Sequence, residues 1–254
     1  MLLRLDFGLA IGLNQPLRFS LQPDDEIGWS PEIAQSRYDK TGKTGSRIKF
    51  PELLDALILH PPRPDPRLLN VWADLREFSR MGNDAAASGT KMPMKVATRL
   101  ASSAPDRLLR LAMPPGSERS LHELLRYCML AYVKVLLIKL KGIGRKMTFL
   151  AERLRVVLRG WWGCLKSQTQ AGSQEEGVIK LVFWGLIVAS VSIFEECDEE
   201  EWLCEMLAKA AAALGLRSWA DAKDVLKGFL WIDLIFDELA EHVFERWCSE
   251  GCEM

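Results

Sequence analysis

Paired signals for the start and end of helices recur through the second half of this 254-residue chain. Four times a Ser or Asp is followed three residues later by Glu or Asp. At this spacing the first side chain can accept hydrogen bonds from the free amides of a first helical turn. Glycines at 142 and 215 follow helical segments, where glycine adopts the left-handed conformation that ends a helix. The four predicted starts are Ser120 with Glu123, Ser173 with Glu176, Asp198 with Glu201, and Ser218 with Asp221.

Apolar residues recur at helical spacing between these signals. Residues 201–214 carry one apolar face, whereas residues 178–194 are apolar nearly all round, which is typical of a central helix with neighbours on every side. Between residues 222 and 247 apolar side chains repeat in steps of three and four, which predicts one long helix bent near Gly228. No segment alternates in the manner of a strand. The sequence therefore predicts an all-α fold.

Residues before 120 are interrupted by prolines and read as irregular. Short helices fit at residues 51–60, 65–81 and 105–113, and the small-residue sequence GNDAAASG at 82–89 is predicted to be a linker. We expect a single domain over residues 1–254. Its residues 1–116 form a loop-rich part with short helices, and its residues 117–250 form the main helical core, with apolar packing between residues 124–158 and 178–247.

The longest apolar run is too short to cross a membrane. Its 14 residues, from Leu181 to Phe194, reach about 21 Å as a helix against about 30 Å for the hydrocarbon core of a bilayer. The first residues place Arg4 and Asp6 inside the segment that a secretory signal would keep apolar. We therefore expect no membrane insertion and an intracellular protein, in which the six cysteines are reduced thiols.

Charge is distributed unevenly, although the net charge is only −1. Residues 1–166 hold 27 Lys and Arg against 16 Asp and Glu, a net charge of +11, and residues 167–254 have a net charge of −12. We expect the two halves to pack together and leave compensating charged faces. An alternative takes residues 139–166, rich in Lys and Arg, as a surface for phosphates, with Trp161 and Trp162 available to stack on bases. The apolar residues of this segment favour an ordinary core-facing helix.

Catalytic patterns are not found. The chain has three histidines, His60, His122 and His242, and no glycine-flanked nucleophilic serine or dinucleotide-binding glycine pattern. The KTGKTGS sequence at Lys40 resembles a phosphate-binding loop only superficially, because no strand precedes it. The sequence therefore names no catalytic residue and no cofactor, and we expect a protein that is not an enzyme.

Metal-ligand spacing is equally weak. No CxxC pair occurs, and the spacings of Cys197 with Cys204 and of Cys248 with Cys252 do not match a structural zinc site. A row of carboxylates four residues apart, at Asp233, Asp237 and Glu241, is interpreted as the solvated side of the last helix. We therefore predict no metal ligand. The acidic residues between 195 and 201 favour the start of the following helix, and an alternative is that they engage coactivators.

Several segments together resemble a known family. They are LLRYCMLAYVKVLLIKLKGIGRKMTFLAERLRVVL (124–158), KLVFWGLIVASVS (180–192), EWLCEMLAKAAAALGL (201–216) and SWADAKDVLKGFLWID (218–233). With LLRLDFGLAIGLNQPLRF (2–19) and VWADLREF (71–78), they resemble the fungal-specific transcription factor domain, and the resemblance extends from Leu2 to about Trp247. Its most specific mark is the set of tryptophans at 184, 202, 219 and 231.

This resemblance implies a helical regulatory domain that lies C-terminal to a binuclear zinc cluster in fungal regulators. The cluster itself needs six cysteines in two close groups, and here the six are scattered from Cys128 to Cys252. We expect the regulatory part alone, in a truncated product, a diverged paralogue or a fragment whose zinc-cluster segment lies upstream. DNA would then be contacted only indirectly or through that missing upstream zinc cluster.

The resemblance also implies a nuclear location and partners among transcriptional coregulators or a second copy of the chain. Two alternatives remain open. In one, the domain senses a small apolar ligand such as a sterol, bound between helices. In the other, it is a dimerisation or interaction module that uses the apolar stripe of residues 222–247, although burial of that stripe within the monomer is favoured.

Overall fold

The fold is that of a computed structural model, which describes residues 65–92, 94–111, 120–141, 148–167, 173–194 and 201–249. These residues form eight α-helices and no strand, so the predicted all-α fold is confirmed for this part of the chain. The helices are α4 (Pro66–Ala87), α5 (Met94–Arg110), α6 (Leu121–Lys141), α7 (Thr148–Ser167), α8 (Ser173–Ser192), α9 (Glu201–Ala213), α10 (Trp219–Lys227) and α11 (Asp233–Ser249).

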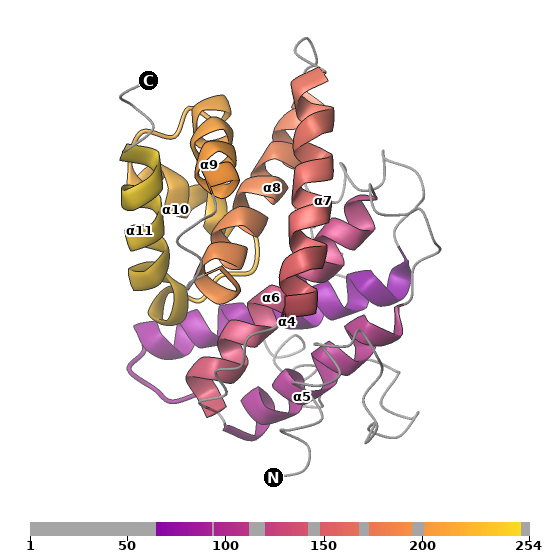
Figure 1. Ribbon diagram of the computed structural model, residues 1–254. Helices are drawn as coiled ribbons and strands as arrows, with labels where there is room; N and C mark the ends of the chain where they lie inside the picture. Colours follow the sequence, from indigo (N-terminus) through magenta and orange to yellow (C-terminus); the bar gives the residue numbers. More distant parts are fainter. Residues whose placement is uncertain are drawn as a thin grey trace.

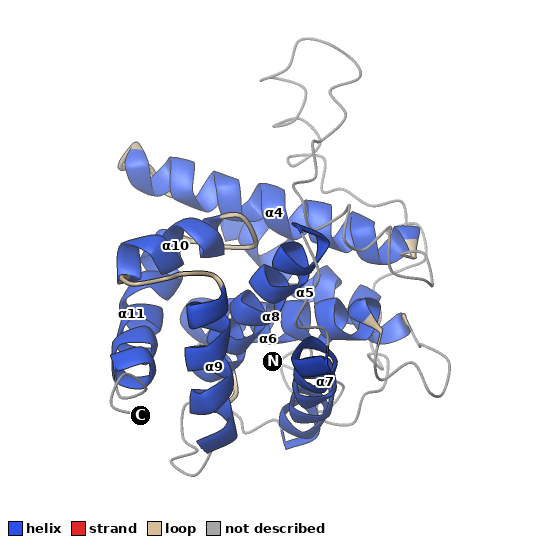
Figure 2. Cartoon of the chain, turned by 90° about the horizontal axis from the view of Figure 1, so that it is seen from above, coloured by secondary structure: helices blue, strands red, loops and turns tan. Residues whose placement is uncertain are grey.

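Helix α8 is the centre of the arrangement. It contacts α6, α7, α9, α10 and α11, and residues 181–190 are all buried, as its apolar surface predicts. Figure 1 shows α7, α9 and α11 standing roughly parallel, while α4 runs across their lower ends beside α5. Figure 2, seen from above, shows α4 lengthwise, with α7, α9 and α11 all on one side of it.

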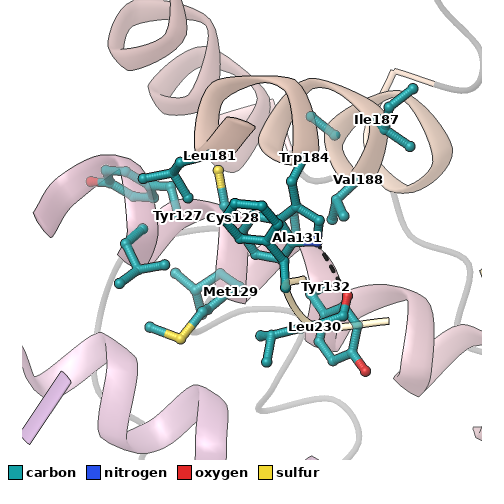
Figure 3. Close-up of a cluster of buried hydrophobic side chains, with 14 of the residues drawn as sticks. Tyr127, Cys128, Met129, Ala131, Tyr132, Leu181, Trp184, Ile187, Val188 and Leu230 are labelled. Carbon is teal, nitrogen blue, oxygen red and sulfur yellow. Dashed lines mark hydrogen bonds between the residues drawn. The ribbon is translucent and has the colours of Figure 1, made fainter. Parts of the chain in front are cut away.

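A close approach at one glycine sets the distance between α6 and α8. A Cβ added to Gly185 would lie 2.6 Å from Cys128 Sγ, which is too short for a non-bonded contact. Because glycine has no side chain, the backbone of α8 can lie against the thiol of α6. Figure 3 shows Cys128 beside Trp184 in this interface, surrounded by Leu181, Ile187 and Val188. Burial raises the pKa of the Cys128 thiol, so this sulfur is a packing atom.

Most of the predicted helix signals that fall on described residues are observed. Ser218 and Asp221 form a complete capping box at α10, in which each side chain accepts from the other's backbone amide. The Ser120 hydroxyl accepts from the Glu123 amide before α6. Gly215, with φ of +68°, follows α9 in the left-handed conformation. The predicted signals at Asp198 and Gly142 lie outside the described residues, as do the short helix at 51–60 and the loop at Lys40.

Two predictions for the first half are wrong. The segment 82–89 is not a linker, because α4 continues to Ala87 and ends at Ser88 and Gly89. Its alanines are strong helix formers, and Gly82 marks a tight contact, since a Cβ there would lie 3.3 Å from Ile232. The helix predicted at 105–113 instead begins at Met94 and contains Pro105 in its interior.

The predicted long helix at 222–247 is also wrong in one respect. It is broken at Gly228, the position of the expected bend, into α10 and α11. The intervening residues 228–232, called the α10–α11 connection below, are buried at Phe229, Leu230, Trp231 and Ile232.

One continuous core joins the helices. It includes side chains of α4 and α5, such as Trp72, Leu75 and Leu108, in addition to those of the predicted 124–158 and 178–247 packing. None of the helices in the described residues has the length and apolar character needed to cross a bilayer.

Truncating Trp231 to alanine tests this core. The side chain is 2% exposed, and removing a buried tryptophan leaves a cavity that costs about 3–5 kcal/mol in the free energy of unfolding. Urea denaturation of the Trp231→Ala variant is expected to show this loss. The control is Leu234→Ala, since Leu234 is 84% exposed and its loss should cost less than about 0.5 kcal/mol. Equal midpoints for Trp231→Ala and the parent would contradict the packing.

Candidate functional site

The side chains of residues 71–78 on α4 reach three different parts of the molecule. Trp72 enters an aromatic cluster with α8, Asp74 pairs with α5, and Arg76 donates to the α10–α11 connection. Asp74, Leu75 and Phe78 are buried, and so are Val71 and Trp72 at the start of the segment. This short stretch therefore connects the two halves of the chain, and it is the candidate functional site.

The aromatic cluster consists of Trp72, Trp184 and Phe229. The Trp72 ring is nearly perpendicular to both other rings, with its centroid 5.6 Å from that of Trp184 and 6.3 Å from that of Phe229. Trp184 and Phe229 are stacked at 5.6 Å with an angle of 10° between their planes. Edge-to-face and offset stacked pairs are the favoured aromatic geometries. The cluster thus joins α4, α8 and the α10–α11 connection.

Hydrogen bonds from distant side chains satisfy the backbone of the α10–α11 connection. Arg76 donates to the Gly228 carbonyl oxygen at 3.3 Å, and Trp184 Nε1 donates to that of Leu230 at 3.1 Å, the dashed line in Figure 3. Asn83 acts twice: its Nδ2 donates to the Trp231 carbonyl and its Oδ1 accepts from the Asp233 amide, both at 2.9 Å. Without these partners, buried carbonyl groups here would carry a desolvation cost.

One ion pair joins α5 to α4, and an arginine of a second pair joins α6 to α5. Arg107 of α5 pairs with Asp74 of α4 at 2.5 Å. On α6, Arg126 Nε and Nη2 donate to the two carboxylate oxygens of Glu123, and Nη1 donates to the Leu108 carbonyl at 3.2 Å. Because Asp74, Glu123 and Arg126 are almost fully buried, removing the partner of any of them would leave an uncompensated charge in the interior.

His122 is a buried titratable residue of this region. Its Nε2 atom has no hydrogen-bond partner. The residue lies in the first turn of α6 and is 3% exposed. Burial lowers the pKa of His122, because the imidazolium form is poorly solvated there, while the carboxylates of Asp65 and Glu123 oppose this effect by attracting the proton.

The described arginines of the basic segment on α7 lie over aromatic rings. The guanidinium carbons of Arg153, Arg155 and Arg159 lie 5.3 Å from the Phe149 ring, 5.7 Å from Phe194 and 4.8 Å from Trp202, respectively. Leu150, Leu154, Val157 and Leu158 are buried, which confirms the core-facing stripe. Trp161 and Trp162 pack partly buried against the core. Both rings are therefore already committed to packing, which does not favour the alternative of base stacking.

The predicted carboxylate row on α11 is engaged with α10. Asp237 accepts from Lys223 at 2.6 Å and from Trp231 Nε1 at 2.9 Å, and Asp233 pairs with Lys227 at 3.0 Å. Asp233 and Asp237 therefore form ion pairs with lysines of α10 in addition to being partly exposed to solvent. Among the described residues, no group of three or more His, Cys, Asp and Glu side chains is placed to hold a metal ion. Cys197, Cys252, His60 and the acidic residues 195–200 lie outside the described residues, as does the side chain of Cys248.

Of the four tryptophans that mark the resemblance, Trp184 and Trp231 are fully buried, and Trp202 and Trp219 are partly buried. The sequence reasoning missed Asp74, Asn83, Arg107 and Arg126. A signal for two of them is visible afterwards, because Asp74 and Arg126 are charged residues set among buried apolar neighbours. The arrangement orients helices relative to one another, and its described carboxylates are paired with arginine or lysine.

Comparison of the chain with models of protein families, with curated proteins and with solved structures found no match in any of the three.

Replacing Asn83 tests the link between α4 and the α10–α11 connection. In Asn83→Ala the Trp231 carbonyl loses its donor, and leaving a buried polar group without a partner costs about 1–3 kcal/mol. Chemical denaturation should show this loss in the free energy of unfolding. Asn83→Asp should be destabilised as well, because a carboxylate cannot donate. The matched control is Asn70→Ala, at an exposed position of the same helix. Equal stability of the Asn70 and Asn83 variants would contradict the role of Asn83.

His122 predicts a pH dependence. Since its pKa is lower in the folded chain than in the unfolded chain, the unfolded state binds more protons between these two values. The contribution of His122 to the free energy of unfolding is therefore fully present above about pH 6.5, and it is lost as the pH falls towards the pKa of the folded state. Thermal unfolding across this range should show a shallower fall for His122→Phe than for the parent. His242→Gln, changed at an exposed position of α11, serves as the control. Parallel curves for parent and His122→Phe would rule out this contribution.

Proposed function

We propose that this chain is the regulatory domain of a fungal transcription regulator, which acts through protein partners in the nucleus and does not itself read DNA or catalyse a reaction. The observation that supports the proposal is the convergence of three segments that carry the family resemblance. Residues 71–78 supply Trp72, residues 180–192 supply Trp184, and residues 218–233 supply Phe229, and these three rings form the aromatic cluster.

Convergence matters because residues 71–78 lie more than 100 positions before the other two segments in the chain. A resemblance that covers a single domain predicts that its segments pack together, and these three do so at the aromatic cluster. The two remaining described segments of the resemblance belong to the same body: α6 and α7 pack on α8, and α9 packs on α8 and α11.

A regulatory role also suits the chemistry of the site. The contacts around α4 set the relative positions of α5, α6, α8 and α11, and a partner that binds one of these helices is thereby coupled to the others. Contact with DNA would come through a zinc-cluster module elsewhere, because the cysteines of this chain lack its spacing.

The alternatives gain less support. The apolar stripe suggested for dimerisation is largely covered within the chain, since Ala222, Leu226, Phe236 and Ala240 are fully buried. The large side chains that would line a sterol-like ligand site, such as Trp72, Trp184 and Phe183, are likewise buried against other side chains of the core. We therefore keep the partner-based function.

Tethering the chain to DNA tests the proposal. The full chain is fused to an unrelated DNA-binding domain, and transcription of a reporter with the matching site is measured in a fungal host. A regulatory domain should change reporter output in either direction, because it recruits coregulators. The Asn83→Asp variant is expected to lose the effect, because it loses the hydrogen bond from α4 to the α10–α11 connection. The Asn70→Ala variant should keep the effect. Unchanged output from a fusion present in the nucleus at normal abundance would refute the proposal.

A further inference from the structure

Helix α10 is held less firmly than the helices around it. Ala222 and Leu226 are its only fully buried residues among nine, whereas α8 buries twelve consecutive residues, 181–192. Trp219 and Val225 add partly buried contacts. Since buried apolar area is the main source of stability, α10 has little of its own to hold it in place.

Lysine–aspartate pairs add to this attachment. Lys223 lies 2.6 Å from Asp237 and 3.7 Å from Asp233, and Lys227 lies 3.0 Å from Asp233. The four side chains are between 26% and 45% exposed. Exposed pairs of this kind are weak and are screened by salt.

Both ends of α10 are built so that the helix can move as a unit. Its first turn is closed by its own capping box, Ser218 with Asp221, and therefore needs no contact with α8 or α11. Before it, the chain turns at Gly215 in the left-handed conformation. After it, the α10–α11 connection is fixed to α4 and α8 by Arg76, Asn83 and Trp184. Movement of α10 can thus stop at Gly228.

Trp219, the first residue of α10, covers two aromatic residues that are otherwise buried. Its ring centroid lies 6.4 Å from that of Trp231 and 6.1 Å from that of Phe244. If α10 leaves, Trp231 and Phe244 gain exposure, and Asp233 and Asp237 lose their lysines. Asp233 Oδ1 is buried and has no hydrogen-bond partner even with α10 in place.

We propose that α10 detaches from α8 and α11 as a unit, and that the surface beneath it binds an amphipathic helix of a protein partner with the pattern of α10. That pattern is a pair of apolar residues four apart, as at 222 and 226, with lysines or arginines four apart next to them, as at 223 and 227. The apolar pair would replace Ala222 and Leu226, and the basic pair would meet Asp237 and Asp233. This proposal does not depend on a role in transcription.

Hydrogen exchange of the full chain, followed by mass spectrometry, tests detachment. Amides of α10 are expected to exchange at least about tenfold faster than those of α8 and of the middle of α11, as in a locally opening unit. Raising NaCl from about 0.1 M to about 1 M shortens the screening length from about 10 Å to about 3 Å and should speed exchange in α10 alone.

Variants separate the lysine pairs from a general effect on stability. Lys223→Met with Lys227→Met should accelerate exchange in α10 and leave α8 unchanged. The matched control is Lys209→Met, which removes an exposed pair with Glu205 on α9 and should not affect α10. Protection of α10 equal to that of α11, or no response to the double substitution, would overturn the detachment.

A labelled peptide with the sequence of residues 217–228 tests the binding surface. Fluorescence anisotropy should show it binding the Lys223→Met, Lys227→Met double variant more tightly than the parent, because the variant's own α10 competes less. A peptide with glutamate at both lysine positions should bind about tenfold more weakly, since two pairs contribute roughly 1.4 kcal/mol together. Equal binding of the two peptides, or no binding of the native one, would overturn the assignment of the surface.

Discussion

The contact between Trp72 and Trp184 is the constraint on which the arrangement of helices depends. The ring centroids of Trp72 on α4 and Trp184 on α8 are 5.6 Å apart, and Phe229 of the α10–α11 connection completes the cluster by stacking on Trp184. Large aromatic side chains bury more area than any others, so this single point of contact outweighs the individual polar interactions around it. The polar groups that surround the cluster, Arg76 and Asn83 among them, serve a different purpose. They satisfy backbone groups that the cluster draws into the interior.

The same contact explains how the basic and acidic halves of the chain are joined. A net charge of +11 on one half and −12 on the other predicts attraction between them, and the halves do pack together. At α4, however, the junction is aromatic and hydrogen-bonded: Trp72 meets Trp184, and Asn83 holds Trp231 and Asp233. The buried ion pair Arg107–Asp74 joins two helices of the first half, and Lys223–Asp237 joins two helices of the second. Apolar burial therefore positions the halves, and cationic side chains of the first half add contacts across the boundary, as Arg155 does on Phe194 and Arg159 on Trp202.

Local signals were sufficient for much of the fold. The capping box at Ser218, the left-handed Gly215 and the apolar surface of α8 were all predictable, because each depends on residues within a few positions along the chain. The break at Gly228 was not, although the bend was expected there. Continued helical spacing beyond it favours a helix, and the competing hydrogen bonds come from Arg76 and Asn83, about 150 positions away. For the same reason Gly82 looked like part of a linker, while its lack of a side chain serves the contact with Ile232.

The α10–α11 connection and α10 thus differ in how firmly they are attached to the rest of the fold. The connection after Gly228 is held by side chains of α4 and α8, whereas α10 before it is held by a few apolar contacts and by exposed lysine–aspartate pairs. A partner can shift an equilibrium only by its difference in affinity for the two states. A partner helix that binds the surface beneath α10 has such a difference, because that surface is accessible only in the state in which α10 has detached. The small number of buried contacts made by α10 keeps the opposing free energy low, while the fixed connection prevents the opening from spreading into the aromatic cluster and unfolding the domain.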